Sequence, residues 1–293
     1  MKKTAVLICL TGSFLISACS NMDIMNPGVK VVSVLTNQYS VGSSNTVTLN
    51  SVNNDIAVYP SAGSNTVIVT SNYVYSAGIT AGKSYLSNHV LTLQTIVNGN
   101  LSVSMNSNLY PDNWNIYSIG SVVTCYLPTN SGLILSNVAV SLVNGNITVM
   151  NAALSDLDVS CVNGTINLSN ISAAQVSESA VNGVINNDIT SVKLLSAMAT
   201  NGACSYTMDS FRDVSNCSVS LRMLNASCSI KLGTSARSNL LLGVTLVNGV
   251  VNNSLVFNND IISNMNAFVG GNGNQLNTLS VSLLNGLVSV TNE

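Results

Sequence analysis

The sequence predicts an all-β protein, and within that class a single-stranded parallel β-solenoid (β-helix) with turns of roughly 19 residues. Two observations predict it. Val, Ile, Leu, Thr and Ser alternate along most of the 293 residues, as in half-buried strands, and helical spacing is nearly absent. Asn-Gly pairs recur along the chain, and from Asn144 to Asn201 each follows the previous one after 19 residues. A fixed period of this length is typical of a solenoid.

Each repeat is expected to begin with a corner at the asparagine. When the units are aligned on this residue, the third residue after it is apolar and the fourth is polar. A strand with one face in a core requires this alternation. Asn and Gly also tolerate positive φ, which suits a corner. The predicted turn residues are Asn98, Gly99, Asn144, Gly145, Asn163, Gly164, Asn182, Gly183, Asn201, Gly202, Asn248, Gly249, Asn285 and Gly286, with Asn225-Ala226 as a further copy.

An antiparallel sandwich is the alternative fold, because Asn-Gly is also the signal for a two-residue hairpin. The regular step without a second turn signal at half-period favours the solenoid. Cys204 and Cys228 then hold equivalent inward positions in successive units. We expect them to stack as neighbouring free thiols, since parallel side-chain vectors fit disulfide geometry poorly.

The period divides the chain. Residues 31–96 fit it badly and predict longer strands, paired antiparallel in one arrangement, that cap the repeats. A wide gap between repeats places an insertion at residues 106–120. The predicted division is a signal peptide at 1–18, a lipidated tether at 19–30, an N-terminal β region or cap at 31–96, and solenoid repeats at 97–293.

The first residues have the three parts of an export signal. Lys2 and Lys3 precede an apolar run that is shorter than the ~20 residues of a spanning helix. The run ends in Ile-Ser-Ala-Cys at Cys19, which resembles the bacterial lipobox. The resemblance implies a diacylglycerol on the Cys19 thiol, cleavage between Ala18 and Cys19, and acylation of the new amine. An ordinary signal peptide with a chance cysteine is the alternative.

The lipid would fix the location of the mature protein. Each buried methylene adds ~0.8 kcal/mol, so two or three acyl chains hold a protein to a membrane essentially permanently. Residue 20 is Ser and not Asp. By resemblance to sorted lipoproteins of double-membraned bacteria, this favours the outer membrane. The predicted location is the bacterial cell envelope, with the membrane as partner through the lipid on Cys19.

Composition excludes several functions. Charged residues make up 7% of the chain, and no basic stripe exists, so no nucleic-acid partner is predicted. Asn and Ser supply the polar surface, which suits stacked strands whose Asn side chains form hydrogen-bonded ladders. The cysteines have no regular spacing and no Cys-x-x-Cys, so no disulfide framework, metal or cofactor is predicted. His89 is the only histidine and has no acidic neighbour in sequence, so the protein is predicted not to be an enzyme.

A polysaccharide-active enzyme is an alternative that the carboxylates raise. Asp156 and Asp158 share a strand face, and Asp209 and Asp213 flank an expected loop. Glycoside hydrolysis needs two carboxyl groups about 5 to 10 Å apart in a cleft. Such clefts bring extra aromatic and basic residues, and this region is poor in both, so solvated surface acids are the simpler interpretation.

Aromatic residues gather in the insertion at 106–120. Tyr110, Trp114 and Tyr117 could present their rings to a glycan or protein ligand, because Tyr and Trp dominate binding hot spots. The alternative, that they fold back over the side of the protein as a separate small core, is favoured.

The repeated Val-Asn-Gly-x-Ile pattern behind a lipobox resembles a bacterial family of adhesin-type domains of unknown function. Residues 144–149, 163–168 and 53–58 carry the likeness best, and it spans about residues 45–293. The resemblance implies a parallel β-solenoid at the envelope and transfers no binding residues. The predicted function is therefore a non-enzymatic envelope lipoprotein with an adhesin-like binding or surface-structural role. A self-assembling scaffold, in which rods stack end to end, is the alternative.

Overall fold

The computed structural model describes residues 4–9, 28–40, 46–89, 91–105, 115–128, 135–213, 216–255, 259–264, 267–271 and 277–292. Within them the chain is almost entirely strand, with two helices, α1 (Ile79–Asn88) and α2 (Thr234–Arg237). The strands are β1 (Thr4–Cys9), β2 (Val29–Tyr39), β3 (Thr46–Asn53), β4 (Ile56–Ser61), β5 (Thr66–Ser76), β6 (Thr92–Val97), β7 (Asn100–Met105), β8 (Ile116–Pro128), β9 (Leu135–Met150), β10 (Ala153–Phe211), β11 (Ser218–Leu232), β12 (Leu240–Asn253), β13 (Asn259–Asn264), β14 (Ala267–Gly271) and β15 (Asn277–Asn292).

The prediction of a single-stranded parallel β-solenoid is wrong, although the protein is all-β. The described strands form one 15-stranded sheet of mixed direction. β1, β2, β5 and β8 pair antiparallel at one end, and β12, β14 and β13 do so at the other. The physical reason is that two-residue alternation reports which face of a strand is buried and not the direction of its neighbour. The 19-residue period holds from Asn144 to Asn201, and the strands outside this part of the chain do not follow it.

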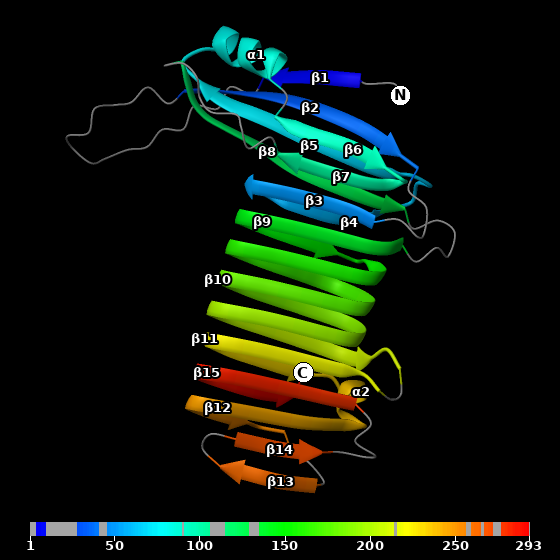
Figure 1. Ribbon diagram of the computed structural model, residues 1–293, viewed down its shortest axis with the longest axis vertical. Helices are drawn as coiled ribbons and strands as arrows, with labels where there is room; N and C mark the ends of the chain where they lie inside the picture. Colours follow the sequence, from blue (N-terminus) through cyan, green and yellow to red (C-terminus); the bar gives the residue numbers. More distant parts are fainter. Residues whose placement is uncertain are drawn as a thin grey trace, which may run out of the picture.

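The middle of the sheet is parallel and in register. Asn163 lies opposite Asn144, and Ile166 lies opposite Ile147, across β10 and β9. Figure 1 shows this part, from β9 to β11, as a coil of stacked turns. Ile147, Ile166 and Ile185, each three places after a corner asparagine, are fully buried. The alternation locked to the corner thus describes the inside and outside of these turns correctly.

Cys204 and Cys228 are opposite one another in β10 and β11, and both are buried free thiols. The expectation that they stack without a disulfide is confirmed. Burial raises the pKa of the Cys204 thiol to about 12, so it stays protonated and behaves as a small apolar core residue.

The order of strands departs from the order of the sequence near the C-terminal end. β15 lies between β11 and β12 and pairs in parallel with both. Figure 1 shows β15 in red between the yellow β11 and the orange β12. The order of strands in the sheet is therefore β11, β15, β12, β14 and β13. The last strand in the sequence lies between two strands that precede it.

The N-terminal strands stack on the first turn of the coil. β3 pairs in parallel with β9 and β7, while β4 pairs in parallel with β9 and β8. β6 and β7 form a hairpin whose turn is Asn98-Gly99, with φ of 52° and 79°. Asn98 is therefore a hairpin turn and not a corner of the coil, as the alternative meaning of Asn-Gly allows. The domain boundary expected between residues 96 and 97 falls inside this hairpin.

One apolar core runs through the stacked turns. Its buried side chains extend continuously from Tyr39 to Val290. A smaller core of Val31, Val74, Tyr85, Leu91 and Ile116 lies where α1 packs on β2 and β5. Each buried Val, Leu or Ile contributes ~1.5–3 kcal/mol relative to an exposed one, so the long core holds the turns in a rigid stack.

Candidate binding surface

The corner asparagines form a hydrogen-bonded column along the outside of the coil. In each pair of neighbouring turns, Nδ2 of one asparagine donates to Oδ1 of the next at 2.6–3.1 Å. The expected asparagine ladder is thus confirmed. A primary amide both donates and accepts, so one side chain continues the ladder in both directions. The column runs through Asn53, Asn144, Asn163, Asn182, Asn201, Asn225, Asn285 and Asn248.

The glycine that follows six of these eight asparagines is required by close approach of the turns. A Cβ placed on Gly164 would lie 1.8 Å from the carbonyl oxygen of Gly145, and Gly202 has the same relation to Gly183. Gly164 has a φ of +152° and Gly202 one of +144°, which favours glycine. The sequence-based reason given for Asn does not hold in the coil, because the predicted turn asparagines other than Asn98 do not have positive φ. Their amides serve the ladder.

A column of exposed aliphatic side chains accompanies the ladder. The residue before the corner asparagine faces solvent, because the residue before that, such as Leu142 at 1% exposed, points into the core. Three further exposed apolar residues flank this column: Met198, three places before Asn201, and Leu287 and Val250, each two places after its corner asparagine. We call the whole set the aliphatic ridge: Val143, Val162, Val181, Leu224, Leu284, Val247, Met198, Val250 and Leu287, which are 37–59% exposed.

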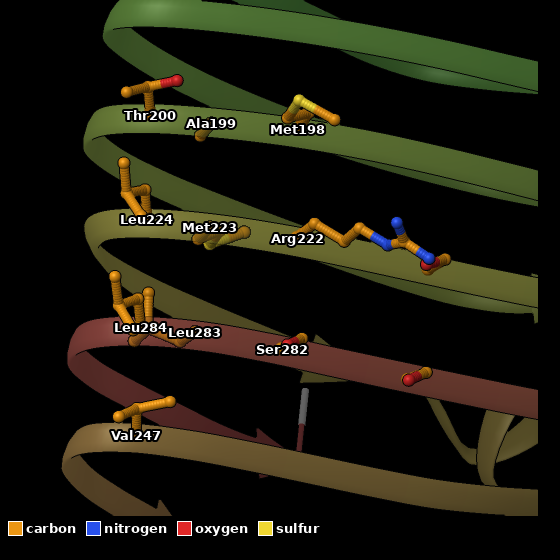
Figure 2. A pocket seen from close by; sticks show the side chains of 12 residues that line it. Met198, Ala199, Thr200, Arg222, Met223, Leu224, Val247, Ser282, Leu283 and Leu284 are labelled. Atoms are coloured by element: carbon orange, nitrogen blue, oxygen red, sulfur yellow. The ribbon is translucent and has the colours of Figure 1, made fainter.

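Four ridge residues, Met198, Leu224, Val247 and Leu284, help to line an open groove of about 550 Å³ over β10, β11, β15 and β12. Figure 2 shows Leu224, Leu284 and Val247 in one column, with Met198, Arg222 and Ser282 in a second. The residues between the two columns, among them Met223 and Leu283, are buried and form the floor. Arg222 is the one charged residue that lines the groove.

The ridge was not predicted from the sequence, although the signal was present. Val-Asn-Gly repeats at Val143, Val162, Val181 and Val247, and the alternation already fixed these valines on the outside. The apolar residue directly before the corner asparagine indicates the ridge, just as the apolar residue three places after it indicates the core.

A buried polar cluster interrupts the apolar core in β10. Tyr206 donates its hydroxyl hydrogen to Oε2 of Glu178 at 3.0 Å, and Asn187 Nδ2 donates to Oε1 at 2.5 Å. Burial raises the pKa of Glu178 to about 7, although both hydrogen bonds act to lower it. Glu178 stands four places before its corner asparagine, where other turns have Leu49, Val140, Val159, Ala197, Leu221, Val281 and Val244. With its carboxyl enclosed, this cluster is part of the core.

The histidine and aspartates considered as catalytic candidates lie at separate places and do not form one site. His89 caps the end of α1, where its Nδ1 is 3.0 Å from the carbonyl oxygen of Tyr85 and its ring stacks on that tyrosine. Asp156 and Asp158 lie exposed on the outside of β10. Asp213 pairs with Lys193 Nζ at 3.0 Å on the surface. In the described part of the chain, no group of His, Cys, Asp and Glu is arranged to hold a metal ion.

Several predicted residues fall outside the described ones. Ala18, Cys19, Tyr110 and Trp114 are among them. Tyr117 is described at the start of β8 and is 53% exposed. Among the described residues, no helix has both the length and the apolar character needed to cross a membrane.

Comparison with known proteins gives only distant likenesses. No family model matches the sequence, and no curated protein matches it. Three solved bacterial structures align with about nine-tenths of this chain. A "putative adhesin" from Bacteroides fragilis is 11% identical with a TM-score of 0.39, over 89% of this chain and 97% of that one. A "putative cell adhesion protein" from Clostridium sporogenes is 10% identical with a TM-score of 0.36, over 89% and 99%.

The third structure is a "putative lipid binding protein" from Parabacteroides distasonis. It is 9% identical with a TM-score of 0.30, over 89% of this chain and 96% of that one. With TM-scores this low, the function of the present chain has to be argued from its own residues.

Proposed function

We propose that this chain is a lipoprotein of the bacterial envelope whose β domain is a non-enzymatic, adhesin-like binding or structural module. The observation that carries the proposal is the aliphatic ridge beside the asparagine ladder. A row of solvent-facing aliphatic side chains on a rigid stack is a candidate surface for association, since the largest apolar patch on a monomer is often functional. The near absence of charge in the groove, where Arg222 stands alone, fits an uncharged partner surface.

The lipid supplies the location. The lipobox ending at Cys19 supports cleavage after Ala18, and Ser20 supports the outer membrane as destination. On this proposal β1 departs with the signal peptide, and β2 becomes the outermost strand at that end of the sheet. The stacked turns then present the ridge on a rigid body that the tether expected at residues 19–30 joins to the membrane.

A second contact is proposed at the insertion 106–120. Tyr117 presents more than half of its surface at the end of that segment, and a tyrosine ring suits a glycan or protein ligand. This contact would act alongside the ridge, on the strands nearest the anchor.

Replacing Cys19 by alanine tests the anchor. We expect the unsubstituted chain, expressed with its leader in a bacterial host, to be found in the membrane fraction and to need detergent for extraction. Intact-mass spectrometry should show a chain that begins at Cys19 and carries acyl groups. Cys19→Ala should lose both properties. Cys9→Ala, which alters a leader cysteine outside the lipobox, should leave both unchanged, and a Cys19→Ala protein that stays acylated and membrane-bound would refute the anchor.

A further inference from the structure

The aliphatic ridge is about as large as the largest apolar patch that a typical single chain exposes. Its nine residues present roughly 600 Å² of surface, at the upper end of the largest apolar patch on a typical monomer. Two such surfaces placed together bury about 1,200 Å², where the range of specific protein interfaces begins. The area is therefore enough for a modest interface without any contribution from the rest of the molecule.

The spacing of the ridge selects the partner. Its side chains repeat at the distance between neighbouring strands, ~4.8 Å, from Val143 in β9 to Val247 in β12, with Thr200 in place of an aliphatic residue at one turn. A surface with the same repeat can place one layer of side chains against each layer of the ridge, as the stacked layers of paired sheets do in a dry zipper. A second copy of this chain has that repeat by construction.

We propose that the aliphatic ridge pairs with the ridge of a second copy of this chain, with the two coils side by side and parallel. The shared direction rests on the proposed lipid anchor, which holds both copies by the same end. A two-fold axis along the coils then places each ridge residue opposite its own counterpart. This lateral pairing differs from end-to-end stacking, in which the end strands of two sheets would meet. At one end of this sheet, the antiparallel strands β14 and β13 lie beyond β12.

Arg222 is consistent with this arrangement. It lies in the column beside Leu224, on the side of the groove away from the asparagine ladder (Figure 2). There its guanidinium can remain in water at the rim of the pair while the aliphatic side chains are covered.

Site-directed cross-linking tests the proposal on the full-length chain expressed with its leader. Leu224→Cys and Val247→Cys each place a single thiol on the ridge at an exposed position, where the fold should not change. Mild oxidation of the cells followed by non-reducing electrophoresis should give a covalent dimer with either variant. Cys125, Cys204 and Cys228 will not react in the same way, because they are buried and burial raises their pKa values.

Two controls make the result specific. Lys231→Cys puts an exposed thiol on the same strand as Leu224 but away from the ridge, and it should give no dimer, like the unsubstituted chain. Adding Leu224→Asp to Val247→Cys places a charge in the interface and should lower the dimer yield at least ten-fold. Equal yields from Lys231→Cys and the ridge variants, or no dimer from either ridge variant, would overturn the proposal.

The anchor and the pairing can fail separately. If Val247→Cys gives a dimer only when mixed with Val143→Cys, the copies are antiparallel and the parallel pair is wrong. If the ridge dimers form equally in a Cys19→Ala background that is no longer membrane-bound, the pairing stands by itself. A dimer that requires the membrane also supports the pairing, because attachment to one surface raises the local concentration of the partners.

Discussion

Gly164→Ala is expected to destabilise the protein by about 3 kcal/mol, because it combines a strained φ with a backbone collision. The added Cβ would lie 1.8 Å from the carbonyl oxygen of Gly145, and φ at this residue is +152°. The neighbouring atom is backbone, so no side chain can move aside and the turn itself must shift. That shift would also disturb the ladder bond between Asn163 and Asn144.

Urea unfolding followed by circular dichroism measures this loss. Gly243→Ala is the matched control, since a Cβ there meets nothing within 4 Å, and its stability should stay within ~0.5 kcal/mol of the parent. Ala226 shows that one corner of the coil does accommodate a methyl group, so the prediction concerns the tight corners. Equal stability of Gly164→Ala and Gly243→Ala would mean that the turns are not stacked as closely as described.

The protein is expected to be more stable in mild acid than at neutral pH on account of Glu178. The folded pKa of Glu178 is about 7 and its ordinary value is 4.5, so the folded state binds the proton more tightly than the unfolded chain. The stabilisation from this proton is fully present below pH 4.5 and is lost as the pH rises to about 7. Above that pH the loss amounts to about 3 kcal/mol.

Glu178→Gln isolates this contribution. A neutral amide has nearly the same shape as the carboxylate and can accept the Tyr206 hydroxyl hydrogen. It can also donate to Asn187 Oδ1, an atom that has no hydrogen-bond partner when residue 178 is Glu. The variant should unfold like the parent at pH 4.5 and should be the more stable protein at pH 8. Asp188→Asn removes an exposed carboxylate from the same strand and controls for the loss of a charge. If the free energies of unfolding of Glu178→Gln and the parent change with pH in the same way, Glu178 is not enclosed as described.

The sequence was most informative where two periods coincide. Around Ile147, Ile166 and Ile185 the alternation of period two is locked to a step of 19 residues, so the inward positions and the register of neighbouring turns could both be predicted. The stacking of Cys204 on Cys228 followed, although the step there is longer than 19, because the corner asparagine resets the register.

Strand direction and strand order could not be predicted in the same way. Pairing between β2, β5 and β8 depends on contacts among distant segments, and a strand alternates equally well beside a parallel or an antiparallel neighbour. The position of β15 between β11 and β12 is also invisible, since Asn285 carries the same corner signal as Asn225 and Asn248. Asn98 shows the remaining ambiguity: the same Asn-Gly pair makes a hairpin in one place and a corner in another.

The chemistry of the candidate binding surface could be predicted from the sequence, but its position could not. The shortage of charge and the abundance of asparagine indicated an uncharged, laddered surface. The residue types most typical of binding hot spots, Tyr110, Trp114 and Tyr117, lie elsewhere in the sequence. Valine before the corner asparagine has no chemical signature of binding, and its role is evident only when the turns align Val162 with Val143 and Val181.

A crystal structure of the chain would test the central claim most directly, through the positions of two side-chain columns in one electron-density map. The account predicts that Asn144, Asn163, Asn182 and Asn201 form one hydrogen-bonded column, with Leu224, Leu284 and Val247 on the outside beside it. The contradicting result would be Asn-Gly corners that join antiparallel hairpins, as Asn98 does, with those aliphatic side chains turned into a core. In that case neither the ladder nor the ridge would exist as a surface.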